Sequence, residues 1–186
     1  LVTLELSSRI HGSQRADFLD KSYAEVIKNA RNFCEIACAL GGVMLKPYLD
    51  GDRIITAFIP ADAFEVTRFC GDGKICGVKF FQTIKEDNII FTKCEEHEWD
   101  GDSYLITNRA YKSRGGKEKQ ISLQEVEQWA DIEPSVRLEG VKTPLFSYFK
   151  MPFIDQSDIT SALGAPIFAR AGRLMDDAQK QYERIL

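Results

Sequence analysis

The chain has 186 residues, of which 44% are hydrophobic, so it is long and apolar enough to bury a core in one domain, or in one domain with an extension. Its 24 basic and 28 acidic side chains give a net charge of −4, which excludes a global attraction to nucleic acid or to an anionic membrane. No apolar run approaches the roughly 20 residues that cross a bilayer, and the first residues lack the layout of a signal peptide.

Residues 17–40 show the pattern of an amphipathic helix. Apolar side chains recur there at steps of three and four residues. Gly41-Gly42 follows, and glycine can adopt the left-handed conformation that ends a helix. Cys34 and Cys38 are four residues apart and therefore share a face of this helix. Because no second pair at ligand spacing completes a metal site, small core side chains are the better interpretation.

After Gly42 the apolar period changes from helical to two, and turn signals recur at short intervals. Asp50-Gly51-Asp52 is typical of a tight hairpin turn, because Asp-Gly accepts positive φ angles. Gly71-Asp-Gly-Lys74 is interpreted as a β-turn and not as a phosphate-binding loop, since a strand pattern and not a helix follows it. Three hairpins are predicted: Val43–Leu49 with Arg53–Ile59, Phe64–Cys70 with Ile75–Ile84, and Asn88–Glu98 with Ser103–Lys112.

The last third of the chain is less regular. Residues 113–120 form a polar loop that is too hydrophilic to be buried. Ser122 and Glu125 match a capping box and predict a short middle helix to about Ala130. A strand pair is expected across 136–138 and 145–150. From Pro166 a long C-terminal helix is predicted to reach Leu186 and to continue in a longer protein.

The predicted fold class is therefore α+β, with an antiparallel β meander of hairpins packed with the N-terminal, middle and C-terminal helices. We expect a lead-in over residues 1–16, one α+β domain over 17–160, and the C-terminal helix over 161–186. Because the chain does not begin with Met, we expect it to be an excised piece of a longer protein.

No residue pattern predicts a catalytic or metal site. The cysteines are odd in number and lie in apolar patterns, so we expect all of them to be reduced, buried thiols of a protein made in the cytoplasm; they are Cys34, Cys38, Cys70, Cys76 and Cys94. Residues 94–98, Cys-Glu-Glu-His-Glu, could imitate a metal cluster, but strand alternation places His97 on the opposite face from Cys94, and an exposed acidic sheet edge is the favoured interpretation. Four aspartates of the last third show no pairing for acid–base work; they are Asp155, Asp158, Asp176 and Asp177. We expect no cofactor.

One basic cluster could contact phosphate. It has Tyr111 interleaved and consists of Arg109, Lys112, Arg114, Lys117 and Lys119. Such a cluster can neutralise a nucleic-acid backbone, and it is equally what a solvated hairpin loop looks like. Both interpretations stay open at this point.

Four blocks in a fixed order resemble the portal proteins of tailed bacteriophages, the family also described as phage portal or minor capsid protein. The first is Ala39-Leu-Gly-Gly-Val-Met-Leu-Lys-Pro-Tyr48, and the second is Phe58-Ile-Pro-Ala-Asp-Ala-Phe64. The third joins Tyr104–Tyr111 to Ser122–Trp129, and the fourth joins Pro144–Pro152 to Ser161–Ala171. The likeness runs from about Asp17 to the C-terminus. Met151-Pro-Phe-Ile-Asp155 departs from the family, where an asparagine-rich turn is expected.

The resemblance implies a non-enzymatic structural subunit of a ring, usually of twelve copies, at one capsid vertex. Double-stranded DNA passes through the ring during packaging and ejection without sequence-specific contacts. The implied partners are other copies of the subunit, the terminase large subunit, the major capsid and scaffolding proteins, and head-completion proteins that make it a head–tail connector. The implied location is the virion of a phage or prophage, with no membrane, after synthesis in the bacterial cytoplasm. Residues 17–160 would be the wing-like domain, with the last helix running toward the stem.

Two alternatives remain open. A non-enzymatic nucleic-acid-binding module would depend on the basic cluster. A cysteine-dependent or metal-dependent enzyme would depend on Cys34 with Cys38, or on Cys94 with His97.

Overall fold

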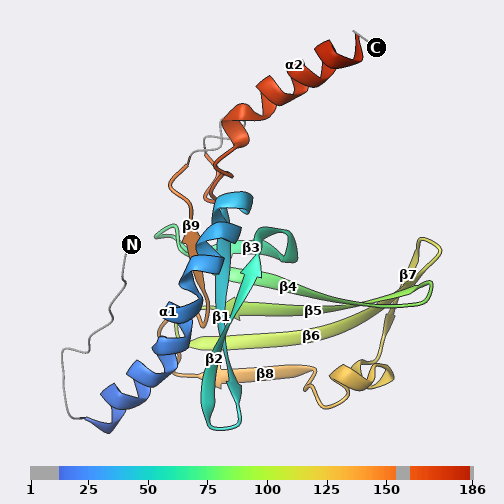
Figure 1. Cartoon of the computed structure of the whole chain (residues 1–186). Helices are drawn as coiled ribbons and strands as arrows, with labels where there is room; N and C mark the ends of the chain where they lie inside the picture. Colours follow the sequence, from blue (N-terminus) through green and yellow to red (C-terminus); the bar gives the residue numbers. More distant parts are fainter. Residues whose placement is uncertain (1–12, 154–159, 185–186) are drawn as a thin grey trace. The chain divides into compact units, whose positions relative to one another are not determined.

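The computed structural model describes residues 13–153 and 160–184. The chain divides into two compact units, one of Leu1–Ala61 with Tyr148–Leu186 and one of Asp62–Ser147. The α+β class with antiparallel sheets is confirmed (Figure 1). The boundaries expected near residues 16 and 160 stay predictions. Residues 1–12 of the expected lead-in, Asp155 and Asp158 lie outside the described residues.

The first unit begins with helix α1, Gln14–Leu40, which confirms the predicted N-terminal helix. It starts three residues earlier than expected because Ser13 caps it, its hydroxyl oxygen accepting the amide of Ala16 at 3.1 Å. The helix ends at Gly41, which has a φ of 86° and donates its amide to the carbonyl of Ala37 at 2.8 Å. Phe33 of α1 stacks on Phe58, so one stripe of the helix packs against the strands that follow it.

Those strands form a three-stranded sheet in the order β2-β1-β9. Strands β1, Gly42–Asp50, and β2, Arg53–Pro60, make the predicted hairpin with Asp50 opposite Arg53. Strand β9, Ser147–Lys150, pairs with β1 from the other side. The predicted strand pair across 136–138 and 145–150 is therefore wrong. Both segments are extended, but β8, Ser135–Glu139, pairs with a strand of the second unit, because each segment joins the nearest open sheet edge.

The C-terminal helix is shorter than predicted. Helix α2 covers Gly172–Glu183, after a 3-10 turn at Ala169–Ala171, and residues 185–186 lie outside the described residues. The segment before it cannot continue the helix because it is tied to the end of α1: the amide of Ile167 donates to the carbonyl of Cys38 at 2.9 Å. Tertiary contacts therefore override the helical periodicity that the sequence shows there.

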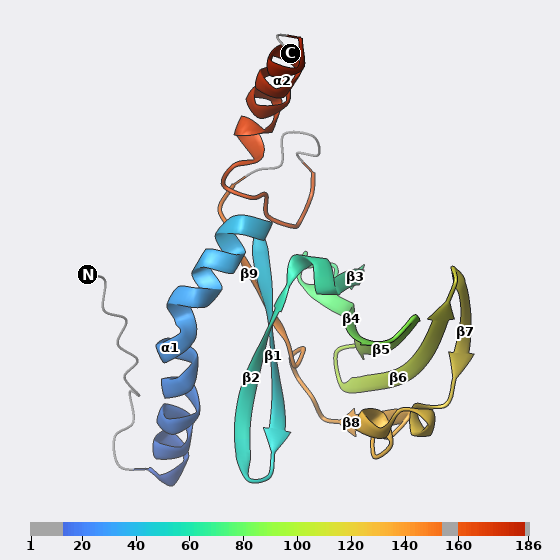
Figure 2. The same ribbon diagram turned by 45° about the vertical axis from the view of Figure 1, so that its right-hand side comes forward.

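The second unit is built on a six-stranded antiparallel sheet with the main order β3-β4-β5-β6-β7 and with β8 paired to β6. After a 3-10 turn at Ala61–Ala63, its strands are β3, Phe64–Phe69; β4, Ile75–Glu86; β5, Ile89–Trp99; β6, Ser103–Arg114; and β7, Lys117–Ile121. Two of the predicted hairpins are confirmed here, namely β3–β4 and β5–β6. Figure 2 shows that the sheet is curved and not flat.

The predicted middle helix is absent. The capping box does form, since the amide of Ser122 donates to a carboxylate oxygen of Glu125 at 3.1 Å. However, the segment folds as two 3-10 turns, Leu123–Glu125 and Glu127–Trp129, separated by the extended Val126. In this arrangement the three apolar side chains Leu123, Val126 and Trp129 are all buried. They form a buried cluster with Phe91 and Ala110.

The polar segment 113–120 is also more ordered than predicted. It completes a hairpin in which Arg114 lies opposite Lys117 and Gly115-Gly116 makes the turn with φ values of 58° and 77°. The expectation that it is not buried is confirmed for residues 114–120, which are exposed. The segment was predicted to be a loop because a run of polar side chains suits a loop and a strand with two solvated faces equally well.

Candidate functional site

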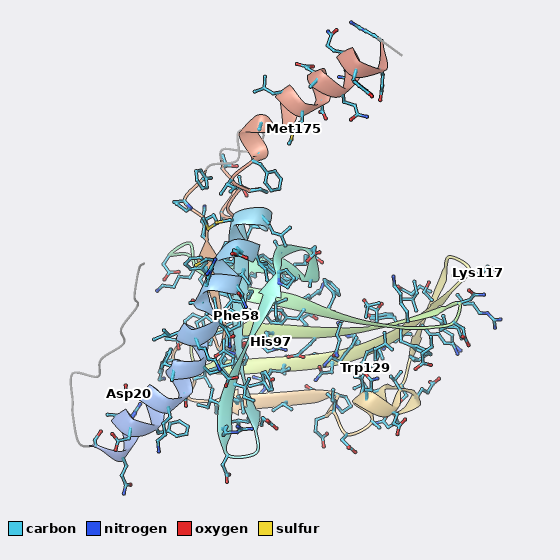
Figure 3. The ribbon with its side chains drawn as sticks, viewed as in Figure 1. Asp20, Phe58, His97, Lys117, Trp129 and Met175 are labelled. Atoms are coloured by element: carbon cyan, nitrogen blue, oxygen red, sulfur yellow. A yellow bond between two sulfur atoms is a disulfide. The ribbon has the colours of Figure 1, made fainter. Side chains whose placement is uncertain are left out.

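The β6–β7 hairpin gathers most of the predicted basic cluster on one face. Lys112 lies directly opposite Lys119, and Arg114 lies directly opposite Lys117. Since residues two apart on a strand, and residues opposite each other in an antiparallel pair, share a face, these side chains form one group of four. We call Lys112, Arg114, Lys117 and Lys119 the hairpin cation face. Figure 3 shows Lys117 at the free tip of the hairpin.

Arg109 does not belong to this face. It stands an odd number of residues from Lys112 on β6, and its guanidinium donates to Glu96 at 3.0 Å on the other side of the sheet. Lys79 approaches the same carboxylate at 3.7 Å, so Glu96 is already balanced by two cations. The sequence therefore predicted one cluster of five cations, whereas strand alternation places four of them on one face of the sheet and Arg109 on the other.

The hairpin cation face has no carboxylate partner among the described residues. Arg114, Lys117 and Lys119 are exposed, and Lys112 is half-buried with its ammonium group 5.5 Å from the centre of the Phe91 ring. Like charges directly opposite each other in a sheet are destabilising, and two such pairs are adjacent here. This local cost, with no ion pair to offset it, is the kind of departure that marks a functional surface.

Nearby carboxylates reduce this charge without pairing with it. Glu86 is in register with Ile89, which is in register with Arg114, so Glu86 shares the face but lies two strands away, roughly 10 Å at ordinary strand spacing. Glu118 lies opposite Ser113 and therefore on the other side of the hairpin. Neither of these two carboxylates therefore pairs with the four cations.

The segment predicted to be an exposed acidic edge instead lies in the middle of the sheet, where Glu95 and Glu96 are half-buried and Glu98 is exposed. Strand β5 lies between β4 and β6, and His97 is only 4% exposed. The predicted alternation is correct, because His97 and Glu95 share the face opposite to Cys94. The prediction that this segment is an edge strand was wrong, because the local sequence does not show how many strands lie on either side of a segment.

A chain of polar side chains crosses this buried face. Lys93 Nζ lies 3.4 Å from Glu95, whose other carboxylate oxygen is 2.7 Å from His97 Nε2. His97 Nδ1 is 2.7 Å from the hydroxyl of Tyr104. With the proton on Nε2, His97 donates to Glu95 and accepts from Tyr104, so both ring nitrogens are satisfied. Aromatic side chains enclose the chain, including Phe80 and Phe146 on His97.

The environment of these buried polar side chains favours a structural role for them. Burial raises the pKa of Tyr104 far above its usual value, so its hydroxyl stays protonated and can donate. Burial also raises the pKa of the Cys94 thiol, which works against a thiolate nucleophile at that position. Sequence reasoning missed the Lys93–Glu95–His97–Tyr104 chain, although the two-residue spacing of its first three members was a usable signal.

The cysteines differ from the expectation that all are reduced and buried. Cys70 and Cys76 form a disulfide across the β3–β4 turn, with their Cα atoms 5.6 Å apart. Cys34 is exposed, Cys38 is half-buried and Cys94 is buried. The β3–β4 hairpin brings Cys70 and Cys76 together, and a count of cysteines cannot predict such a pairing. Within residues 13–153 and 160–184 no three side chains of His, Cys, Asp or Glu are grouped as metal ligands. Asp176 and Asp177 are exposed on α2.

In the part of the chain that the structure describes, neither helix combines the length and apolar character required to cross a bilayer. Comparison with models of protein families and with curated proteins finds no match to this chain.

Proposed function

We propose that this chain is part of the portal subunit of a tailed bacteriophage, a non-enzymatic component of a ring through which double-stranded DNA enters and leaves the capsid. The observation that carries the proposal is the order of the four sequence blocks that resemble portal proteins, together with the way the first and the fourth block meet in the fold.

The meeting point lies where α1 passes into β1. The carbonyl of Gly41 accepts the amide of Met151 at 3.0 Å, and the hydroxyl of Tyr148 accepts the amide of Gly164 at 3.1 Å. The backbones at Gly41 and Gly164 are so close that a methyl group on either would collide with the carbonyl of the other. Residues more than 100 positions apart in sequence are therefore interlocked, as the hydrogen bond from Tyr148 to Gly41 across 107 positions illustrates.

This architecture suits a mechanical role. The first unit ties its N-terminal helix, hairpin and C-terminal segment at one junction, and the second is a curved sheet with a buried polar chain. A ring subunit needs packed units that transmit load and surfaces for its neighbours. The proposed partners are other copies, the terminase large subunit, the major capsid and scaffolding proteins, and head-completion proteins, at the capsid vertex of the virion.

The oligomeric state of the full-length protein tests this proposal. We expect closed rings by electron microscopy and a single high-mass species by light scattering, when full-length protein is prepared with its capsid partners under assembly conditions. A full-length protein that stays monomeric there contradicts the proposal. Genes for a terminase and a head-assembly protein next to its own gene are also expected.

A second candidate function is a stand-alone nucleic-acid-binding module, which the hairpin cation face favours. It differs from the portal proposal in expecting DNA binding without ring formation. A metal-dependent enzyme is the weakest alternative, and elemental analysis that finds stoichiometric metal in the purified chain would revive it.

A further inference from the structure

We infer that the hairpin cation face is a sequence-independent contact for the phosphate backbone of duplex DNA. The inference rests on the proposed function for the choice of DNA as the polyanion. It goes beyond that function by naming the residues that touch DNA and by excluding Arg109.

The spacing of the face suits a backbone contact. Lys112 and Arg114 are two residues apart on β6, about 7 Å along the strand, and the pairs Lys112–Lys119 and Arg114–Lys117 are about 5 Å across. Lysine and arginine stems can adjust over several ångströms, so four cations in this area can follow a line of phosphates along one strand. A hairpin with an exposed tip can enter or follow a groove without moving the rest of the sheet.

The composition of the face favours phosphate over an acidic protein. Interfaces between proteins usually centre on large apolar or aromatic anchors. Among the described residues, no well-exposed large hydrophobic side chain belongs to the hairpin cation face. Ile90 lies in the same part of the sheet and is 39% exposed, but it is in register with Ser113 and therefore on the opposite face. Backbone binding to DNA needs only cations and counterion release, which is what this face offers.

The expected signature is a salt dependence of defined steepness. Four neutralised phosphates give a slope of about −3.6 in log K against log salt, so affinity should fall about 150-fold between about 50 and 200 mM salt. The affinity of one chain will be modest, and a ring would multiply it through multivalency.

The experiment measures binding of the purified chain to a short fluorescent duplex of mixed sequence by anisotropy over this salt range. The test variant carries Lys112→Gln, Arg114→Gln, Lys117→Gln and Lys119→Gln. The matched control carries Lys28→Gln, Arg31→Gln, Arg53→Gln and Lys142→Gln, which removes the same charge from exposed positions elsewhere. A triple variant that keeps Lys112 guards against a fold defect from losing its contact with Phe91.

We expect the test variant to lose most of the binding and nearly all of the slope, the triple variant to keep about a quarter of the slope, and the control and Arg109→Gln to retain wild-type slopes. Glu86→Gln should strengthen binding, because it removes the carboxylate that shares the face. Equal losses in test and control variants, or equally tight binding of polyglutamate of matched charge, would overturn the inference. Rings of full-length protein with no duplex binding would refute only this inference, whereas duplex binding without rings would refute the portal proposal.

Discussion

Trp129 permits a quantitative test of the core of the second unit. Its side chain is 1% exposed within the cluster of Phe91, Ala110, Leu123 and Val126, yet its indole nitrogen has no hydrogen-bond partner among the described residues. Trp129→Ala should cost about 3–5 kcal/mol, as expected for removing a large buried aromatic side chain.

Trp129→Phe should cost far less. It removes two ring carbons, worth about 1.6 kcal/mol at 0.8 kcal/mol each, and it also removes a buried unsatisfied donor, whose desolvation costs about 1–3 kcal/mol. The two terms nearly cancel, so we expect a net change within about 1 kcal/mol of zero. The control is Trp99→Phe in the same unit, because the indole of Trp99 donates to the carbonyl of Val141 at 2.7 Å and its loss leaves that carbonyl unpaired.

The assay is urea unfolding followed by far-UV circular dichroism, since the chain has only two tryptophans and fluorescence would change with either substitution. The reasoning is refuted if Trp129→Phe is as destabilising as Trp129→Ala, or if Trp99→Phe proves the milder of the two phenylalanine variants. The first result would mean that packing of the indole and not its unpaired nitrogen decides the energy.

Three further outcomes are expected. Hydrogen bonds from the amides of Ser103 and Asp102 and from the hydroxyl of Ser103 lower the pKa of Asp100 to about 2. The contribution of Asp100 to stability is therefore present above an unfolded pKa of about 3.9 and is lost as pH falls toward 2. Asp100→Asn should flatten the pH dependence of the urea midpoint in this range, and an unchanged slope would contradict this. Gly41→Ala should lower the unfolding temperature more than Gly51→Ala, because both have positive φ but only Gly41 would collide with a neighbouring backbone; equal effects in calorimetry would show that φ alone matters. Thiol titration of denatured, unreduced protein should find the three free cysteines, and titration after reduction should find all five. In the folded chain the exposed Cys34 should react first. Five thiols before reduction would refute the disulfide between Cys70 and Cys76.

Features that depend on near neighbours were predictable. The end of α1 at Gly41 and the turns at Asp50-Gly51-Asp52 and Gly71–Lys74 follow from the positive φ angles that glycine accepts, which are 86° at Gly41, 58° at Gly51 and 79° at Gly73. The strands follow from a two-residue period. The same alternation correctly separated His97 from Cys94. These choices are made within a few residues of chain, so they are present in the sequence without the fold.

What the tertiary structure decided depends on which strands become neighbours. The pairing of β6 with β7 brings Lys117 and Lys119 beside Lys112 and Arg114, and the central position of β5 buries His97 beside Tyr104 and Glu95. The need to bury Leu123, Val126 and Trp129 on one sheet replaces a well-capped helix with 3-10 turns. The sequence by itself determined the N-terminal helix, the long strands and the glycine turns, because local backbone preferences act over a few residues. Only the fold decided which faces, partners and burial each strand has, and whether 123–129 and 117–121 form a helix, turns or a strand, because those energies come from residues far apart in the chain.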